Sequence, residues 1–188
     1  RLILAIPGQA AVNVGDGNNC HINTKGRIRG GPKAAGIYYP MASGTPTTGP
    51  TDQQRVTGSP ALSATKIDYD DSYEAVFSVP LSQLRAMASM VLPDLTNFPN
   101  PVPYGSLIIV EGNSIQFNSS IRLKGNGIVI LVGNVTLSSG NLSNFSGFLY
   151  VDGNFTMRAP PDIRGAVVVT GNMTLQGSGD FATITYDE

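Results

Sequence analysis

The apolar positions of the C-terminal half repeat with a period of about twenty residues. From Gly105 onward, four segments share one plan: a glycine, a short apolar run, a Gly-Asn pair and a short alternating stretch. They read GSLIIVEGNSIQF, GIVILVGNVTL, GFLYVDGNFTM and GAVVVTGNMTL. A third apolar patch, such as Ile163 in the third unit, completes each unit. Stretches rich in Val, Ile, Leu and Phe between Gly, Asn and Ser are typical of short strands.

Three strands per unit at a fixed period predict one coil of a β-helix. We therefore predict an all-β fold, a right-handed three-sided parallel β-helix (β-solenoid), with four regular coils over residues 105–188. Like side chains would stack one coil apart, about 4.8 Å along the axis. The alternation predicts that Thr136, Thr156 and Thr174 point outward, whereas the inward positions are Val135, Leu137, Phe155, Met157, Met173 and Leu175. A leucine-rich repeat or an antiparallel sandwich fits less well, because neither explains the recurring Gly-Asn pair.

The repeated Gly-Asn pairs predict corners between strands. Glycine adopts positive φ freely and asparagine does so better than most residues. Asparagine side chains stacked coil upon coil can form a hydrogen-bonded ladder, which we expect from Asn113, Asn134, Asn154 and Asn172. The competing interpretation is N-glycosylation, because the Asn-x-Ser/Thr rule is met at Asn118, Asn134, Asn141, Asn144, Asn154 and Asn172.

The rest of the chain carries less regular signals, which we read as parts of one β-solenoid domain over residues 1–188. Residues 1–39 predict irregular N-terminal coils, and the Pro-, Gly- and Thr-rich residues 40–77 predict an exposed loop excursion. Within residues 78–104, helical spacing between Pro80 and Pro93 predicts a short helix that covers an end or a flank of the solenoid, followed by an extended lead-in. The apolar start resembles no signal peptide, which predicts an excerpt of a longer chain.

Composition excludes several kinds of chemistry. Only 13% of the residues are charged, 41% are hydrophobic, and no apolar run is long enough for a membrane span. The single cysteine, Cys20, cannot form an internal disulfide, and one His with one Cys makes a His/Cys metal site or a His-based triad improbable. We therefore predict no metal site and no cofactor.

The acidic residues of the repeats do not predict a sugar-cleaving site. Glu111 and Asp152 precede equivalent Gly-Asn corners, but Val132 occupies the coil between them. A separation of two coils, about 10 Å, is wider than two carboxylates that share one glycosidic bond would want. We predict no catalytic residues and no enzymatic activity. The acidic run 68–74 could hold calcium, but it lacks the EF-hand spacing, and a solvated loop is the favoured interpretation.

Basic charge is concentrated near the N-terminus. Residues 1–34 hold five basic side chains and one acidic side chain, a net charge of +4, so residues 35–188 carry −5 of the total of −1. Alternation about Ile28 predicts that Arg27 and Arg29 share one outward face, with Lys25 along the same row. An outward basic row can bind phosphates, and tyrosines can stack on bases. The candidate nucleic-acid-binding residues are Lys25, Arg27, Arg29, Lys33, Tyr38 and Tyr39. The alternative is ordinary solubilising charge on an end coil.

Residues 78–188 resemble a known family. The helical segment PLSQLRAMASMVLPDL, the four repeats and the ending FATITYDE are similar to the β-solenoid ectodomain of PilX-like type IV pilus-assembly proteins. The similarity is greatest to the solenoid insertion of a competence-associated minor pilin. The resemblance implies an extracellular, cell-surface module on a pilin stem near the pilus tip. A partner minor pilin and incoming DNA are its implied partners, and no family motif transfers as a DNA-contacting residue.

Two other functions stay open on the sequence. One is a carbohydrate-binding or carbohydrate-cleaving parallel β-helix, because this fold often carries such activities. The other is a purely structural adhesin or spacer.

Overall fold

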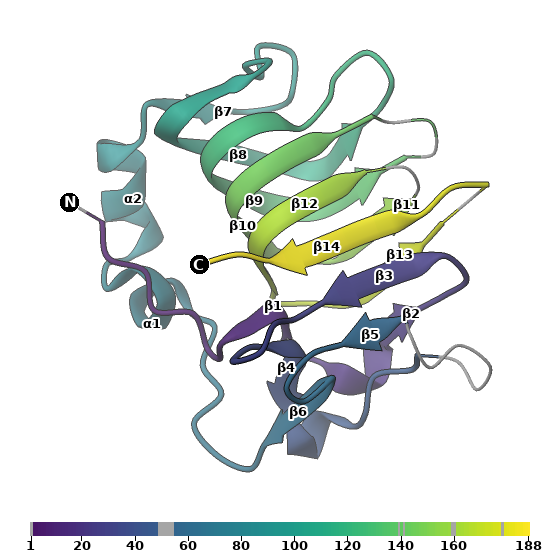
Figure 1. Ribbon diagram of the computed structural model, residues 1–188. Helices are drawn as coiled ribbons and strands as arrows, with labels where there is room; N and C mark the ends of the chain where they lie inside the picture. The colour runs from purple at the N-terminus through teal and green to yellow at the C-terminus, as the bar shows by residue number, and fades with distance from the viewer. Residues whose placement is uncertain (1, 49–54, 139, 141, 159–160, 178) are drawn as a thin grey trace.

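The strands of the computed structural model form a single parallel stack (Figure 1). The structure describes residues 2–48, 55–138, 140, 142–158, 161–177 and 179–188. Every pairing between named strands is parallel, which confirms the predicted parallel β-helix. The strands are β1 (Ala10–Val14), β2 (Cys20–Ile22), β3 (Gly26–Arg29), β4 (Ala35–Pro40), β5 (Val56–Thr57), β6 (Leu62–Thr65), β7 (Met90–Leu92), β8 (Val102–Phe117), β9 (Lys124–Leu137), β10 (Asn144–Asp152), β11 (Phe155–Arg158), β12 (Asp162–Val169), β13 (Met173–Gln176) and β14 (Ala182–Tyr186). The helices are α1 (Tyr73–Phe77) and α2 (Leu81–Met87), with short 3-10 helices η1 (Gly17–Asn19) and η2 (Met41–Ser43).

The stack has three faces, because the long strands bend around corners. The covered face consists, in order, of β7, β8, the middle of β9, β10, β12, β1, β4 and β6. The threonine face consists of the ends of β8 and β9, then β11, β13 and β2. The open face consists of the starts of β9, β10 and β12, then β14, β3 and β5.

The interior has the predicted rows of like side chains. Phe155 pairs with Val135 on one side and Met173 on the other, and all three are buried in one hydrophobic cluster. Thr156 pairs with Thr136 and Thr174 in the outward row between them. Alternation along each strand therefore separates the core from the surface.

The last coil of the chain lies on the first. β12, β13 and β14 pair with β1, β2 and β3, respectively, so both halves of the sequence build one continuous solenoid. The next coil is begun by β4, which pairs with β1. The chain then runs along the outside through α1 and α2 to the opposite end, where β7 starts the descent (Figure 1).

The prediction of an exposed loop over residues 40–77 is wrong in part. β5 pairs with β3 and β6 pairs with β4, so much of this segment belongs to a coil. The reason is burial: Val56 is only 5% exposed, and Leu62 packs against the interior cluster. Residues 49–54 of the predicted loop lie outside the described residues.

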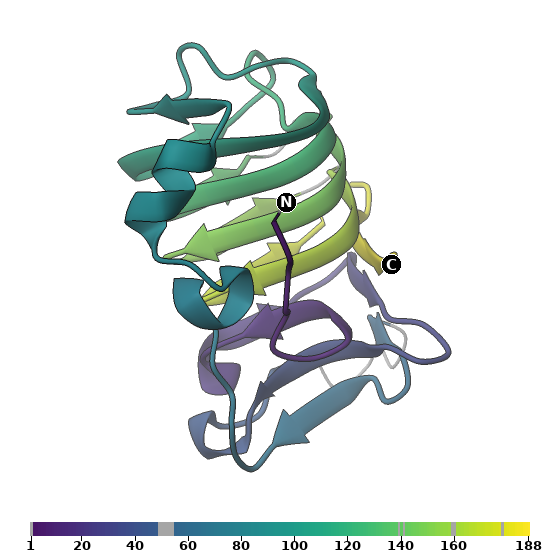
Figure 2. The ribbon, with the colours of Figure 1, turned by 90° about the vertical axis from the view of Figure 1, so that its left-hand side faces the viewer.

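The two helices cover a flank of the solenoid rather than an end (Figure 2). α2 begins after Pro80, as predicted, but it ends at Met87, and the last part of the predicted helical segment forms β7 instead. α1 is not predicted by the sequence; the side chain of its N-cap residue, Ser72, accepts a hydrogen bond from the Ala75 N–H. Val76, Phe77 and Leu84 pack on the outward side chains of the covered face. The covered face is therefore apolar on both sides.

The N-terminal segment lies over the same face instead of forming a strand. Leu2 and Ile6 pack against the helix-covered cluster, and the Ala5 N–H donates a 2.8 Å hydrogen bond to the carbonyl of Val76. Figure 2 shows this segment passing in front of the strands.

The corner between the open and covered faces requires glycine. Gly127, Gly147 and Gly165 stack in register, and Gly165 has φ 133°. A Cβ at Gly165 would overlap the carbonyl oxygen of Gly147 in the neighbouring coil. The glycine that opens each repeat thus allows coils to approach closely at a sharp bend.

Candidate functional site

The open face presents two outward rows of polar side chains. Successive strands are one coil, about 4.8 Å, apart. The strand register places the first row at Lys124, Asn144, Asp162, Thr183 and Arg27. The second row is Asn126, Ser146, Arg164, Thr185 and Arg29.

Basic residues recur on every second coil of these rows. β9 contributes Lys124, β12 contributes Arg164, and β3 contributes Arg27 and Arg29. The intervening strands β10 and β14 carry uncharged hydrogen-bonding residues. Asp162 is the one acidic member of the two rows, and its Oδ2 lies 3.6 Å from Arg164 Nε. The rows therefore carry a net positive charge on a regular surface whose side chains are partly or fully exposed.

Two of the predicted basic residues, Arg27 and Arg29, lie on the open face. The Arg27 guanidinium lies 3.3 Å from the ring centroid of Phe181, and Lys25 Nζ lies 5.9 Å from the same centroid. Lys25 Nζ also donates a 3.2 Å hydrogen bond to the carbonyl of Gly179. Lys33 is exposed in the turn that follows β3. The predicted row thus extends from the open face to its edge.

The two predicted stacking tyrosines do not join this surface, and that prediction is wrong. Tyr39 is only 6% exposed and belongs to the interior cluster. Tyr38 lies on the outer side of the covered face, stacked on Tyr69 with ring centroids 5.9 Å apart. The cause is alternation along β4, which belongs to a different face from β3.

Lys124 and Arg164 were missed by the sequence analysis. They lie about a hundred residues and more from Arg27 in a region of net negative charge, so a count by segment hides them. One signal could have found them: both precede a repeat glycine, Gly127 or Gly165, on the strand that leads to that corner.

The asparagine corners hydrogen-bond from coil to coil through their side chains and backbone. Asn134 Oδ1 accepts from the Asn154 backbone N–H at 3.1 Å, and Asn154 Oδ1 accepts from the Asn172 N–H at 2.9 Å. Asn113 lies outside this series, because a register shift pairs Ser114 with Asn134. Each side-chain carbonyl thus satisfies a backbone donor at a corner.

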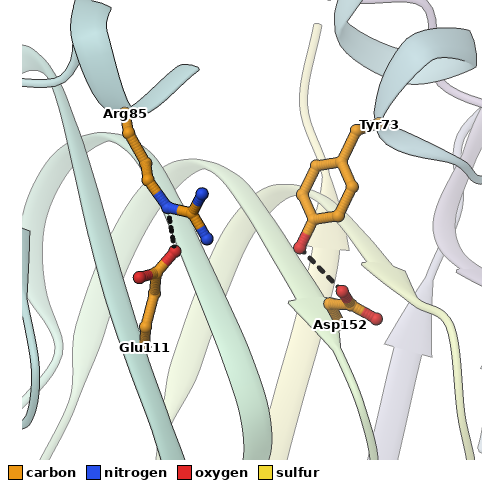
Figure 3. A network of polar contacts seen from close by, with 4 residues as sticks. All are labelled: Tyr73, Arg85, Glu111 and Asp152. Atoms are coloured by element: carbon orange, nitrogen blue, oxygen red, sulfur yellow. Dashed lines mark hydrogen bonds and ion pairs between the residues drawn. The ribbon is translucent and has the colours of Figure 1, made fainter. Parts of the chain in front are cut away.

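Glu111 and Asp152 are both engaged by residues of the helical segment (Figure 3). Arg85 Nε lies 2.6 Å from Glu111 Oε1, and the Tyr73 hydroxyl donates a 2.7 Å hydrogen bond to Asp152 Oδ2. Val132 lies between the two carboxylates in register. Burial, and secondly the bond to Asp152, raises the pKa of Tyr73. These contacts fasten the helices to the solenoid.

An open pocket of about 540 Å³ lies beside these carboxylates. Its lining includes Arg85, Glu111, Asn113, Asn134 and Asp152. This is a polar concave site of the kind that binds small hydrophilic ligands.

The acidic run 68–74 is partly structural. Asp70 Oδ1 accepts from the Ser72 N–H at 2.9 Å, and this hydrogen bond lowers the pKa of Asp70. In the described part of the chain, no three His, Cys, Asp or Glu side chains are grouped so that they could hold a metal ion. Burial, with a smaller contribution from Asp16, raises the pKa of the Cys20 thiol to about 12, which keeps it protonated and unreactive at neutral pH. No helix among the described residues is both long and apolar enough to cross a membrane.

No protein-family model and no curated protein matches the chain. Two solved structures of an ice-binding protein (LeIBP) from Arctic yeast resemble it. One, concerned with its antifreeze activity, has a TM-score of 0.44 and 14% identity, and covers 100% of this chain and 94% of that chain. The other, the glycosylated protein, has a TM-score of 0.42 and 12% identity with the same coverage. Likeness at this level carries no argument about function.

Proposed function

We propose that this chain is a non-enzymatic, extracellular β-solenoid module of a minor pilin or pilus-associated protein, carried near the pilus tip. In this proposal it binds DNA through the open face and contacts a partner minor pilin. The resemblance of residues 78–188 to PilX-like ectodomains supports the pilus context. The observation that carries DNA binding is the recurrence of basic residues on β9, β12 and β3.

The chemistry of such a face is contact with backbone phosphates. Lysine and arginine neutralise phosphates and release condensed counterions, so affinity falls steeply with salt. Phosphate contacts carry no base sequence information by themselves. The uncharged Asn144 and Thr183 between the basic coils can add hydrogen bonds to phosphate oxygens. We therefore expect binding of DNA without strong sequence preference.

The decisive experiment removes the two basic residues that the sequence did not single out. Lys124→Gln combined with Arg164→Gln should lower DNA affinity at least tenfold at low salt. It should also reduce the slope of log affinity against log salt by about two for duplex, roughly one for each lost phosphate contact. The measurement is a fluorescence-anisotropy titration at several salt concentrations.

A charge-matched variant provides the control. Lys66→Gln with Arg158→Gln removes the same charge from exposed positions at the end of the solenoid and on the threonine face. It should change the slope by much less. Equal losses in the two double variants would show a general charge effect and contradict an open-face site.

The pocket beside Glu111 favours a second candidate function, carbohydrate binding. Arg85 and the asparagines at the corner can donate hydrogen bonds to the hydroxyl and carboxylate oxygens of sugars. Neutral and acidic oligosaccharides should then bind the parent protein, and Asn134→Ala should lower its affinity for them. Calorimetry that detects no binding to either class would exclude this candidate.

A further inference from the structure

Tyr104 is the most exposed large hydrophobic or aromatic residue of the described chain. Its exposed fraction is 90%, compared with 36% for Phe181, which directly precedes β14 of the open face. It lies in β8, near the corner where that strand enters the covered face. A tyrosine ring this exposed makes little contribution to the core.

The backbone holds Tyr104 in a bulge. Val102 pairs with Gly125, but the next pair is Ser106 with Gly127, so three residues of β8 stand opposite Asn126 alone. Within the bulge, Gly105 has φ 72°, and the Ser106 hydroxyl donates a 2.7 Å hydrogen bond to the carbonyl of Pro103. A bulge of this kind re-aims a side chain that the regular strand would place elsewhere.

The bulge adjoins the basic rows of the open face. Asn126, opposite Tyr104, is two residues from Lys124 and starts the row that continues through Ser146 to Arg164. Asn126 Nδ2 donates a 3.0 Å hydrogen bond to Ser146 Oγ, which links the first two residues of this row. An exposed aromatic ring therefore lies at one end of a line of basic residues.

We propose that Tyr104 is the base-stacking contact of the open face and that this face takes single-stranded nucleic acid. The inference rests on the proposed function. The sugar-phosphate backbone of the bound strand would follow the basic residues from Lys124 towards β3, while one unpaired base stacks on Tyr104. A positively charged track with a stacking platform is the usual design for binding single strands. A duplex without ends keeps every base paired and stacked on both faces and cannot use the ring in this way.

The other aromatic residues near basic groups are less suited to this role. Arg27 lies over the ring of Phe181, which occupies one of its faces. Tyr39 is in the interior, and Tyr38 is stacked on Tyr69. Among the aromatic residues that the structure describes, Tyr104 is the one that is almost wholly exposed.

Because the sequence contains no tryptophan, Tyr104→Trp creates a single fluorescent reporter. It should be titrated with an oligothymidine of about twelve nucleotides, a relaxed, covalently closed circular duplex, and a short duplex with single-stranded overhangs at both ends. The single strand and the overhangs should quench the emission, and the circular duplex should not. Ile67→Trp is the control, because Ile67 is 71% exposed beyond β6; its emission should not change.

Affinity of the single strand provides the second readout. Tyr104→Ala should weaken it roughly tenfold, whereas Tyr104→Phe, which keeps the ring, should bind like the parent. If Tyr104→Ala leaves affinity unchanged while Lys124→Gln with Arg164→Gln abolishes it, the stacking inference is overturned and the phosphate-binding face stands. If neither variant alters binding, the proposed function fails as well. Equal quenching by the closed circular duplex, or quenching by an acidic oligosaccharide alone, would also overturn the inference.

Discussion

The covered and open faces share a backbone and an interior but differ in their outward side chains. On the covered face, Ile109, Ile130, Tyr150 and Val168 point outward and are buried beneath the helices and the N-terminal segment. On the open face, the outward positions carry Lys, Arg, Asn, Ser, Thr and one Asp, and they are partly or fully exposed. The same strand geometry thus yields a docking surface or a solvated surface, depending on whether the outward-pointing residues, every second one along a strand, are apolar or polar.

The comparison shows how this solenoid separates stability from binding. An apolar outward row needs a cover, because exposed apolar area of that extent is unfavourable in water. A polar outward row needs none and is available for ligands. Substitutions on the two faces should therefore have different consequences, and three predictions test this, from the largest expected effect to the smallest.

The largest effect is expected at Phe77, where α1 meets the covered face. Phe77 is 1% exposed, and its ring lies edge-on to Tyr150 at 5.2 Å and to Phe148 at 5.8 Å. Phe77→Ala should lower the free energy of unfolding by about 3–5 kcal/mol, through lost burial and the cavity left behind. Urea unfolding monitored by circular dichroism measures it.

The control for Phe77→Ala is Thr183→Ala on the open face. Thr183 is outward and partly exposed in β14, so its replacement should change stability by no more than about 0.5 kcal/mol. Similar losses in the two variants would erase the distinction between the faces.

A smaller effect is expected at the asparagine corners, where neither face dominates. Asn154→Ala removes the acceptor of the Asn172 N–H and should cost about 1 kcal/mol, the usual contribution of one hydrogen bond. Thermal unfolding compared with Asn113→Ala, which lies outside the bonded series, checks the prediction. A larger loss from the Asn113 variant would show that the series does not stabilise the corners.

The smallest effect is a pH dependence centred on Asp71, a partly buried residue just before α1 whose backbone carbonyl accepts a hydrogen bond from Tyr150 of the covered face. Burial raises the pKa of Asp71, with smaller like-charge contributions from Asp70 and Asp152, while Tyr69 nearby lowers it. The folded state therefore binds this proton more tightly than the unfolded state. Stability from this group is present below the ordinary carboxyl pKa and is lost as the pH rises through the elevated folded value.

Asp71→Asn tests this dependence, because it removes the titrating group while keeping a similar shape. The parent protein should lose stability relative to the variant as the pH is raised from about 4 towards neutrality. Unfolding free energies of both proteins across that range provide the measurement. Parallel pH profiles would mean that Asp71 is not destabilised by its surroundings.

Much of the candidate site was beyond a reading of the sequence. The basic character of Arg27 and Arg29 is visible in the chain, and alternation about Ile28 correctly predicts that both point outward. The sequence did not show that these two residues share a face with Arg164, because that depends on β14 pairing with both β3 and β12. Tyr39 was misplaced for a related reason, since local spacing does not tell which side of β4 faces the interior.

By itself, the sequence determined the repeat, the parallel coils and the inward rows such as Val135, Phe155 and Met173. These features follow from two local periods: two residues along each strand, and about twenty residues, the length of one coil, along the chain. Only the tertiary structure decided that the last coil rests on the first, that the helices cover a flank, and which distant basic residues share a face. Such choices depend on complementarity between surfaces far apart in the chain, which no local pattern encodes.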